Sequence, residues 1–400
     1  MSRSNIMKDA YIVTAIRTPG CRSTKGAFKD TRPDDLLAFI LKAALEKTSN
    51  LNSADVADVM VGCSFPEAEQ GLNIGRIASL MAGLPESVSG ATINRFCASG
   101  LEAISLAALR IMAGWSEVTL AGGIESMTYV PMGGNMLRPN PEYAHKKGEF
   151  YVSMGITAEN VAKRYKVLRE DQDAFAYQSH MKAAKAQQEG YFTEIVATPA
   201  AKFTLTKKGT YQKETFMQAK DDGVRPTTSL EKLAQLPPVF ALNGSVTAGN
   251  ASQTTDGAAA VVIMSAGMVK KTGVTPIARL KLYTTVGCKP DEMGVGPAVA
   301  IPKLLDMAGL SVRDIGCWEI NEAFASQALY CLRKIGIEDQ MDRVNVNGGA
   351  IALGHPLGCT GAKLCATLLA NMRRLGAKYG VESMCIGGGM GAAALFELCD

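Results

Sequence analysis

The chain has 400 residues, 47% of them hydrophobic, and this length exceeds what one hydrophobic core usually organises, so we expect at least two domains. Its 42 basic and 38 acidic residues give a formal net charge of +4, which is too balanced for a nucleic-acid-binding protein and mildly favours an anionic substrate. Ten cysteines without a Cys-x-x-Cys pair, together with only three histidines, argue against a zinc site.

Short apolar segments alternate with longer helical patterns along the chain, which predicts an α/β fold with mostly parallel strands. We expect eight strands, over residues 9–15, 56–62, 117–121, 258–264, 278–286, 315–320, 383–386 and 392–397. We expect eight helices, over residues 34–48, 73–81, 98–113, 157–165, 170–189, 298–309, 323–335 and 357–375. The helix at 98–113 is apolar on nearly all sides, which indicates burial on several sides.

Two parts of the chain resemble each other. Segment 54–63, ADVADVMVGC, is similar to segment 311–319, SVRDIGCWE, and both parts end in an alanine-rich strand, GAAAVV and GAAALF. We therefore predict two duplicated halves, residues 1–270 and 271–400. The alternative is that any two strand–helix–strand units share such a pattern.

The first half contains an insertion over about residues 129–250. Charged residues, prolines, glycines and two amphipathic helices dominate there, without a clear strand–helix alternation. Long irregular segments in compact proteins are often functional. We expect a subdomain that lies over the first half and covers the substrate.

We expect the protein to reside in a reducing cytoplasm. A long chain with a large core has no need of a disulfide framework. Residues 1–10 carry charges and lack the apolar segment of a secretory signal. The apolar stretch at 257–269 is shorter than the ~20 residues of a membrane span and ends at Lys270, so no span is expected.

Two cysteines and one histidine stand in glycine-rich frames. They are Cys97 in NRFCASG, His355 in NGGAIALGHPLGCTG and Cys385 in CIGGGMG. A thiolate nucleophile, an imidazole base and a second thiol that moves a proton form a complete set for acyl transfer. Cys97 stands at the start of a predicted helix, where the macrodipole and free N–H groups should favour its thiolate. We interpret the other eight cysteines, His145 and His180 as structural.

With these motifs, five further segments give the chain a resemblance to the thiolase family from residue 15 to residue 396. The segments are AIRTP (15–19), AGGIESM (121–127), VTAGNAS (246–252), DGAAA (256–260) and NEAFA (321–325). The resemblance implies the thiolase fold, in which two duplicated βαβαβαββ halves form five αβαβα layers with an inserted loop domain. It also implies a tight dimer.

Within the family, the chain is similar to the degradative 3-ketoacyl-CoA thiolases (acetyl-CoA acyltransferases) of fatty-acid β-oxidation. Biosynthetic acetoacetyl-CoA thiolases typically carry a Pro-His pair after the Glu-Ser-Met segment, whereas this chain reads YVPMGG at 129–134. The carboxy-terminal third resembles the β subunits of bacterial fatty-acid oxidation complexes. A homodimer, a homotetramer and a complex with a hydratase/dehydrogenase subunit all remain open.

The resemblance implies a role for each residue of the site. Cys97 attacks the β-keto carbon and becomes acylated, His355 takes its proton, and Cys385 protonates the departing acetyl-CoA enolate. The backbone N–H groups of Cys97 and Gly387 form one oxyanion hole, and His355 with a water held by Asn321 forms a second. We also expect glycines 387–389 to let the backbone approach the thioester.

The resemblance also implies how the substrate is held. Ser252 should lie near the pantetheine arm of CoA, and Arg225 near its adenine nucleotide. CoA is then a co-substrate, with no permanently bound cofactor and no metal.

Three other functions compete with this one. A biosynthetic acetoacetyl-CoA thiolase has the same fold, and a decarboxylating ketoacyl synthase lacks a second catalytic thiol, so Cys385 argues against it. A silent lipid carrier or scaffold would not need the whole set. Single residues also have alternative roles. Asn321 could serve only as a helix cap. The glycine runs could be read as dinucleotide-binding loops, but they lack the required Gly-x-Gly-x-x-Gly spacing.

Overall fold

The computed structural model describes residues 8–399, so the expectation for the secretory signal falls largely on residues outside it. The strands are β1 (Ala10–Arg17), β2 (Cys21–Arg22), β3 (Asp58–Gly62), β4 (Ser89–Ile93), β5 (Val118–Ser126), β6 (Thr198–Leu205), β7 (Tyr211–Gln218), β8 (Thr255–Ser265), β9 (Ala278–Gly287), β10 (Cys317–Ile320), β11 (Tyr379–Ile386) and β12 (Met390–Leu398). All eight predicted strands are present. The sequence did not predict β2, β4, β6 and β7.

The eight predicted helices are also present, with ends shifted by a few residues. The α-helices are α1 (Pro33–Glu46), α2 (Ile74–Met81), α3 (Ser99–Met112), α4 (Pro141–Lys146), α5 (Met154–Arg164), α6 (Arg169–Gln188), α7 (Leu230–Ala234), α8 (Ala266–Thr272), α9 (Gly296–Ala308), α10 (Ala325–Ile335), α11 (Ala350–Leu353) and α12 (Thr360–Leu375). Two 3-10 turns matter below, η3 (Phe96–Ala98) and η7 (Leu357–Cys359). Among the described residues, no helix is both long and apolar enough to cross a membrane.

The central sheet contains the same strand pattern twice. Its order is β10-β11-β12-β9-β1-β8-β5-β3-β4, with β2 beside β8. In the second half, β10 pairs with β11 in parallel, and the β11–β12 and β12–β9 pairs are antiparallel. In the first half, β3–β5 is parallel, and β5–β8 and β8–β1 are antiparallel. This shared topology supports the duplication over the chance likeness of two strand–helix–strand units.

The prediction of mostly parallel strands was wrong. Within residues 8–399, only the pairs β3–β4, β3–β5 and β10–β11 are parallel. A parallel pair needs a crossover connection, whereas β11 and β12 follow each other through three glycines and therefore form an antiparallel hairpin. Glycine-rich turns are thus where the sequence pattern misled the prediction.

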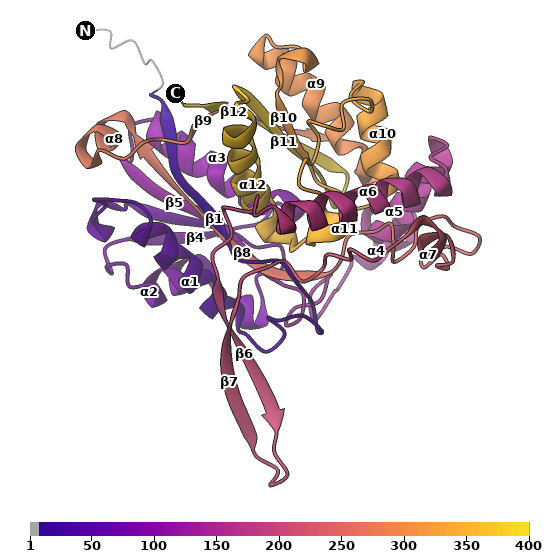
Figure 1. Ribbon diagram of the computed structural model, residues 1–400, viewed down its shortest axis with the longest axis horizontal. Coiled ribbons are helices and arrows are strands. Elements are labelled where there is room, and N and C mark those ends of the chain that lie inside the picture. The colour runs from indigo at the N-terminus through magenta and orange to yellow at the C-terminus, as the bar shows by residue number, and fades with distance from the viewer. Residues whose placement is uncertain (1–7, 400) are drawn as a thin grey trace.

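Alternating side chains on β8 show that this strand is covered on both faces. Val261 and Ile263 join an inner hydrophobic cluster with residues of α3 and α12, whereas Val262 and Met264 join an outer cluster with residues of α1. A third cluster covers the second half, where α9 and α10 pack on the outer face of its strands. The layers are therefore α1 with α2, the strands of the first half, α3 with α12, the strands of the second half, and α9 with α10 (Figure 1).

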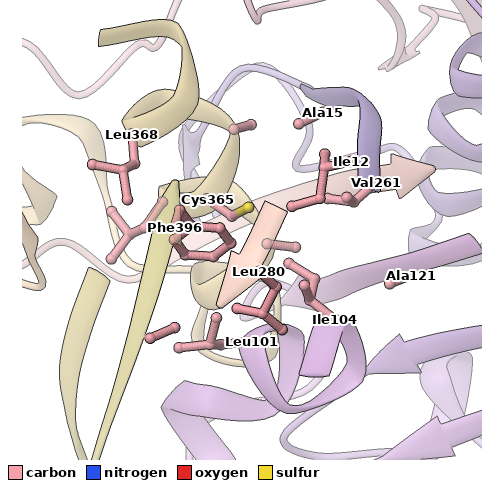
Figure 2. Packing of buried hydrophobic residues seen from close by; sticks show 14 of the residues in the cluster. Ile12, Ala15, Leu101, Ile104, Ala121, Val261, Leu280, Cys365, Leu368 and Phe396 are labelled. Carbon is pink, nitrogen blue, oxygen red and sulfur yellow. The ribbon is translucent and has the colours of Figure 1, made fainter. Parts of the chain in front are cut away.

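The inner cluster belongs to both halves. Figure 2 shows Leu101 and Ile104 of α3 beside Leu280 of β9, with Phe396 of β12 next to Cys365 of α12. All five side chains are at most 5% exposed. This shared layer fixes the two halves against each other and positions the first turns of α3 and α12.

The insertion does not lie only over the first half, as the sequence had suggested. Helices α5 and α6 pack on α10 of the second half, and α6 also packs on α11. Strand β6 instead approaches the first half, where the N–H of Ala201 donates to Thr31 Oγ1 at 2.9 Å. Strands β6 and β7 form a separate hairpin that projects from the body (Figure 1).

Candidate active site

Cys97 lies in the turn η3, between β4 and α3, and is 7% exposed. The hydroxyl of Ser99 stabilises this turn, because it accepts a hydrogen bond from the N–H of Arg95 at 2.9 Å and donates one to the backbone oxygen of Phe96 at 2.6 Å. Phe96 has a positive φ of 44°, which non-glycine residues seldom adopt. The segment NRFCASG therefore forms a sharp strand-to-helix turn that packs Cys97 against Leu357.

His355 precedes η7, and both of its ring nitrogens have partners. Nδ1 lies 2.6 Å from Thr360 Oγ1, and Nε2 lies 3.3 Å from Asn321 Nδ2. Thr360 donates its own proton to the backbone oxygen of Pro356 at 3.2 Å, so its oxygen accepts the Nδ1–H of His355. The ring nitrogen that faces Asn321, Nε2, therefore carries the lone pair and accepts a long hydrogen bond from the Asn321 side-chain NH2 at 3.3 Å. A lone pair at this nitrogen is what a general base requires.

Asn321 lies just after β10 and holds its position through its backbone. Its N–H donates to the oxygen of Ser383 at 2.9 Å, and its own oxygen accepts from Gln327 Nε2 at 2.8 Å. The helix-cap alternative does not hold, because α10 begins at Ala325 and its N-cap residue is Phe324. Asn321 Oδ1 is buried without a hydrogen-bond partner among the described residues, so it is free to bind a water or a ligand.

Cys385 and Gly387 reach the site from the end of β11. Cys385 is fully buried, next to Phe324 and Met293. The backbone N–H of Gly387 faces the sulfur of Cys97, and this contact lowers the thiol pKa against the larger opposing effect of burial. The end of β11 therefore brings a second thiol and a backbone donor to the same place as Cys97.

The glycines after Cys385 serve the turn more than an approach to substrate. Gly388 and Gly389 have φ values of 83° and 86°, which strongly favour glycine. A Cβ on Gly389 would lie 2.5 Å from the backbone oxygen of Cys288. A Cβ on Gly387 would make only an ordinary contact, 3.5 Å from Met154 Sδ, so at this position the protein itself does not require glycine.

Burial keeps the site uncharged at neutral pH. It raises the pKa of Cys97 to about 12 and lowers the pKa of His355 to about 3, with the Lys363 cation adding to the second shift. The pKa of the Cys385 thiol is also raised well above its usual value by burial. Burial therefore opposes the thiolate that the helix start was expected to favour, and burial has the larger effect. The arrangement holds a protonated thiol in η3 and a neutral imidazole just before η7, two turns that contact each other.

Glu125 connects the two halves beneath the site, and the sequence analysis did not identify it. Its carboxylate accepts hydrogen bonds from the N–H groups of Ser64 and Gly358, both at 2.8 Å, and from Gln70 Nε2 at 2.9 Å. Ser64 follows β3, whereas Gly358 lies in η7, next to His355. The sequence does contain a signal for this role. Glu125 is a lone acid in the apolar segment AGGIESM, and a buried carboxylate with hydrogen-bond partners accounts for an acid at such a position.

The helix starts of the two halves meet at two glycines. A Cβ on Gly361 of α12 would lie 2.2 Å from the backbone nitrogen of Leu101, and a Cβ on Gly100 of α3 would lie 2.6 Å from that of Ala362. This close crossing sets η3 against η7. It explains how a cysteine and a histidine 258 positions apart in the chain come together.

Ser252 lies beside the cluster that contains Cys385, whereas Arg225 lies at the surface. The N–H of Ser252 donates to the oxygen of Ala323 at 2.9 Å, and its neighbour Ala251 packs against the cluster that contains Cys385. Arg225 is exposed, and its N–H donates to His180 Nδ1 at 3.2 Å. No hydrogen bond joins either side chain to Cys97 or His355 in the described part of the chain.

Comparisons with known proteins identify the family of the chain. The family model "Thiolase, N-terminal domain" matches residues 10–267, and "Thiolase, C-terminal domain" matches residues 274–398. A protein of Bacillus subtilis named 3-ketoacyl-CoA thiolase is 49% identical over 396 residues, which cover 98% of this chain and 100% of that protein.

Two solved structures share the whole fold. The match to the acetyl-CoA acetyltransferase of Bacillus anthracis has a TM-score of 0.88 at 37% identity. It covers 99% of this chain and 100% of that chain. The dimeric peroxisomal thiolase of Saccharomyces cerevisiae has a TM-score of 0.86 at 40% identity, with 100% of this chain and 99% of that chain covered. On these matches and this fold, the chain belongs to the thiolase family.

Proposed function

We propose that the chain cleaves a 3-ketoacyl-CoA with CoA, giving acetyl-CoA and a shortened acyl-CoA, in fatty-acid β-oxidation. The observation that carries this proposal is the position of the Gly387 N–H and the Cys385 thiol beside the Cys97 sulfur, in a turn that contacts η7, which directly follows the His355–Pro356 pair. The relative named 3-ketoacyl-CoA thiolase, 49% identical to this chain, supports the degradative type.

The first half of the reaction forms an acyl-enzyme. Cys97 sulfur attacks the keto carbon while its proton passes to Nε2 of His355, and the N–H groups of Cys97 and Gly387 stabilise the alkoxide. The carbon–carbon bond then breaks, and the electron pair leaves on the acetyl-CoA enolate. The Cys385 thiol protonates the enolate carbon and becomes a thiolate. Asn321 holds a water that, with protonated His355, stabilises the enolate oxygen.

The second half returns the enzyme to its starting state. The Cys385 thiolate takes the proton of incoming CoA, and the CoA sulfur attacks the acyl–Cys97 thioester. Cys97 leaves as a thiolate and recovers its proton from His355. CoA is thus a co-substrate that leaves in both products, with Ser252 along its pantetheine arm and Arg225 by its adenine nucleotide. Within residues 8–399, no group of His, Cys, Asp or Glu is placed to hold a metal ion.

Acyl trapping tests this proposal. Incubation with a 3-ketoacyl-CoA in the absence of CoA should add the mass of the shortened acyl group to the intact protein. Cys97→Ala should abolish the adduct, and Cys385→Ala should slow its formation by at least a hundredfold, because general acid–base catalysis is worth roughly 10²–10⁴ in rate. An adduct that persists in Cys97→Ala would contradict the assignment of the nucleophile.

A second candidate is a biosynthetic acetoacetyl-CoA thiolase, which joins two acetyl-CoA molecules. The fold match to the Bacillus anthracis acetyl-CoA acetyltransferase favours it. Thiolysis rates over a series of 3-ketoacyl-CoA chain lengths separate the two. Degradative function predicts turnover of long chains, whereas activity confined to the four-carbon substrate supports the second candidate.

The organisation of the protein follows the same proposal. We place the boundary between the halves near residue 270, with the loop domain at about 129–250 inserted in the first half. We propose a cytoplasmic homodimer. Support for the dimer comes from the yeast relative of similar fold, which is named a dimeric thiolase. A homotetramer and a complex with a hydratase/dehydrogenase subunit are the larger assemblies that sedimentation would reveal.

A further inference from the structure

The β6–β7 hairpin extends from the body as a two-stranded arm (Figure 1). Its base is fixed to the loop before α1, where the N–H of Ala201 donates to Thr31 Oγ1 at 2.9 Å and the N–H of Phe203 donates to Asp30 Oδ2 at 3.0 Å. Past these bonds the arm consists of residues 203–213, and all but Thr206 are exposed. An isolated two-stranded ribbon is only marginally stable in water. Contact with another surface would therefore stabilise this one.

The strand register gives the arm one apolar face. Residues directly opposite each other in an antiparallel pair share a face, and the faces alternate along each strand. Phe203 pairs with Lys213, and Leu205 pairs with Tyr211, so these two pairs lie on one face. Phe203, Leu205 and Tyr211 are 44%, 60% and 72% exposed. The opposite face carries only polar pairs at this level, such as Thr204 with Gln212.

The charges of the arm are positive and lie on or beside its apolar face. Lys207 and Lys208 occupy the tip, and Lys213 lies on the apolar face itself, with its Nζ 5.9 Å from the centre of the Phe203 ring. No acidic residue occurs between residues 203 and 213. The arm therefore presents aromatic and aliphatic side chains ringed by ammonium groups.

We propose that residues 203–213 dock on a lipid bilayer that carries anionic head groups. Leu205, Phe203 and Tyr211 would enter the interface between head groups and acyl chains, and the three lysines would contact lipid phosphates. An aromatic and aliphatic face flanked by lysines is the chemistry that interfacial binding uses. The arm projects from the body, which lets it reach a flat surface before other elements touch it.

A second copy of this chain fits the same face less well. Pairing of two arms by a two-fold axis would bring Lys207, Lys208 and Lys213 towards their own copies, with no acid between residues 203 and 213 to neutralise them. An anionic lipid surface has the opposite charge and no such conflict. The proposal does not depend on the reaction of the Cys97 site.

Vesicle flotation of the full chain tests the proposal. At low salt the protein should float with vesicles of phosphatidylcholine and phosphatidylglycerol in equal parts, and it should stay in the soluble fraction with phosphatidylcholine alone. Added salt should release it, because screening weakens the lysine–phosphate attraction. No flotation with the anionic vesicles, or equal flotation with both kinds, would overturn the proposal.

Two variants of the arm locate the contact. One variant removes the charges, Lys207→Ala/Lys208→Ala/Lys213→Ala, and the other removes the apolar side chains, Phe203→Ser/Leu205→Ser/Tyr211→Ser. Each variant should bind vesicles with an affinity lowered by about tenfold or more, given the usual contribution of each surface lysine and buried apolar side chain. Control variants change exposed residues elsewhere, three lysines in Lys47→Ala/Lys270→Ala/Lys334→Ala and one leucine in Leu72→Ser, and should bind as the native chain does. Equal loss in arm and control variants would overturn the assignment of the arm.

Folding and self-association are measured on the same variants. The melting temperature and the thiolysis rate in solution should stay unchanged, since the arm contacts neither Cys97 nor His355. Sedimentation velocity without lipid should also give the native mass. If the arm variants instead lower the oligomeric mass, the arm is a contact between copies and the lipid proposal fails.

Discussion

At the scale of single residues, the state of His355 depends on one hydroxyl group. Thr360 accepts the Nδ1–H of the ring and donates its own proton to the oxygen of Pro356. The other ring nitrogen of His355, Nε2, carries a lone pair and faces the side-chain amide of Asn321. The base that would deprotonate Cys97 is therefore selected by a residue that does not touch the thiol.

Replacement of this hydroxyl should weaken both catalysis and folding. In Thr360→Val the Nδ1–H of His355 loses its acceptor, and the free energy of unfolding should fall by about 1–3 kcal/mol, the usual cost of an unpaired buried polar group. The acylation rate should fall by roughly tenfold or more. A misplaced imidazole that raises the activation free energy by about 1.4 kcal/mol already gives a factor of ten. Stopped-flow acylation and denaturant unfolding measure the two effects.

Thr367→Val provides the matched control for this variant. Thr367 is also a buried threonine of α12, and its hydroxyl donates to Glu194 Oε1 at 2.9 Å, away from His355. It should lose similar stability with little change in acylation, and Thr360→Ser should recover most of the rate. Equal loss of acylation in both valine variants would show that the hydroxyl acts only through general stability.

The sequence could single out the residues that we propose to react but not the residues that position them. Cys97, His355 and Cys385 stand in short glycine-rich motifs that a family resemblance recognises. Glu125 binds groups from 55 to 233 positions away, so its role exists only in the folded chain. The raised pKa of Cys97 has a similar origin, because the local motif does not reveal how deeply the thiol is buried.

At the scale of elements, the crossing of α3 and α12 decides where both turns of the site lie. A Cβ on Gly361 would meet the backbone of Leu101 at 2.2 Å, and a backbone atom cannot move aside as a flexible side chain can. Gly361→Ala should therefore push α12 away from α3 and separate Cys97 from His355. We expect a loss of about 1–3 kcal/mol in the free energy of unfolding, as for other overpacked positions, together with slower acylation.

Gly267→Ala is the control for a glycine in a helix. It lies in α8, where the nearest atom to a new Cβ is a side-chain oxygen at 3.6 Å, so alanine fits without strain. Alanine also has the higher helix propensity, so this variant should be as stable as the native chain or slightly more so. Thermal unfolding compares the two variants. A melting temperature for Gly361→Ala equal to that of Gly267→Ala would refute the close crossing.

The predicted elements succeeded where periodicity was strong and failed where it was weak. Strand β4 reads SGATI, with small and polar residues and one large apolar side chain, so no apolar alternation marks it. Strands β6 and β7 are largely exposed and carry mixed side chains for the same reason. Strand direction failed separately, because it depends on connections in space that the pattern of a single segment does not contain.

At the scale of the whole molecule, two buried carboxyl groups connect stability to pH. Glu319 and Glu382 lie opposite each other on β10 and β11, and neither oxygen of Glu382 has a partner among the described residues. Burial raises the pKa of Glu319 to about 8 and raises the pKa of Glu382 well above its usual value. The folded chain therefore holds protons that the unfolded chain releases near pH 4.5.

Stability should consequently fall as the solution becomes alkaline. A raised folded-state pKa gives a contribution that is fully present below about pH 4.5 and is lost as pH rises through about 8. Each such group contributes a slope of at most about 1.4 kcal/mol per pH unit to the free energy of unfolding. Glu382→Gln keeps the shape, needs no proton, and should flatten this decline between pH 5 and pH 9, as measured by urea unfolding at each pH.

Glu86→Gln, an exposed substitution of the same kind, should leave the pH profile unchanged. A native chain whose free energy of unfolding stays constant from pH 5 to pH 9 would show that the carboxyl pair is not protonated as described. The sequence could not reveal this pair, because each glutamate stands in a separate strand and only the parallel pairing of β10 with β11 brings them together.

The inner layer of α3 and α12 also has an evolutionary consequence. A single ancestral half would have exposed the apolar sides of its inner helix, so it had to associate with an identical copy. In such a symmetric ancestor, both turns carried the same residues. In one fused chain each half can change without its twin, so that one turn can carry a cysteine and the other a histidine. Fusion is thus what permits a two-residue division of labour at the crossing of two similar helices.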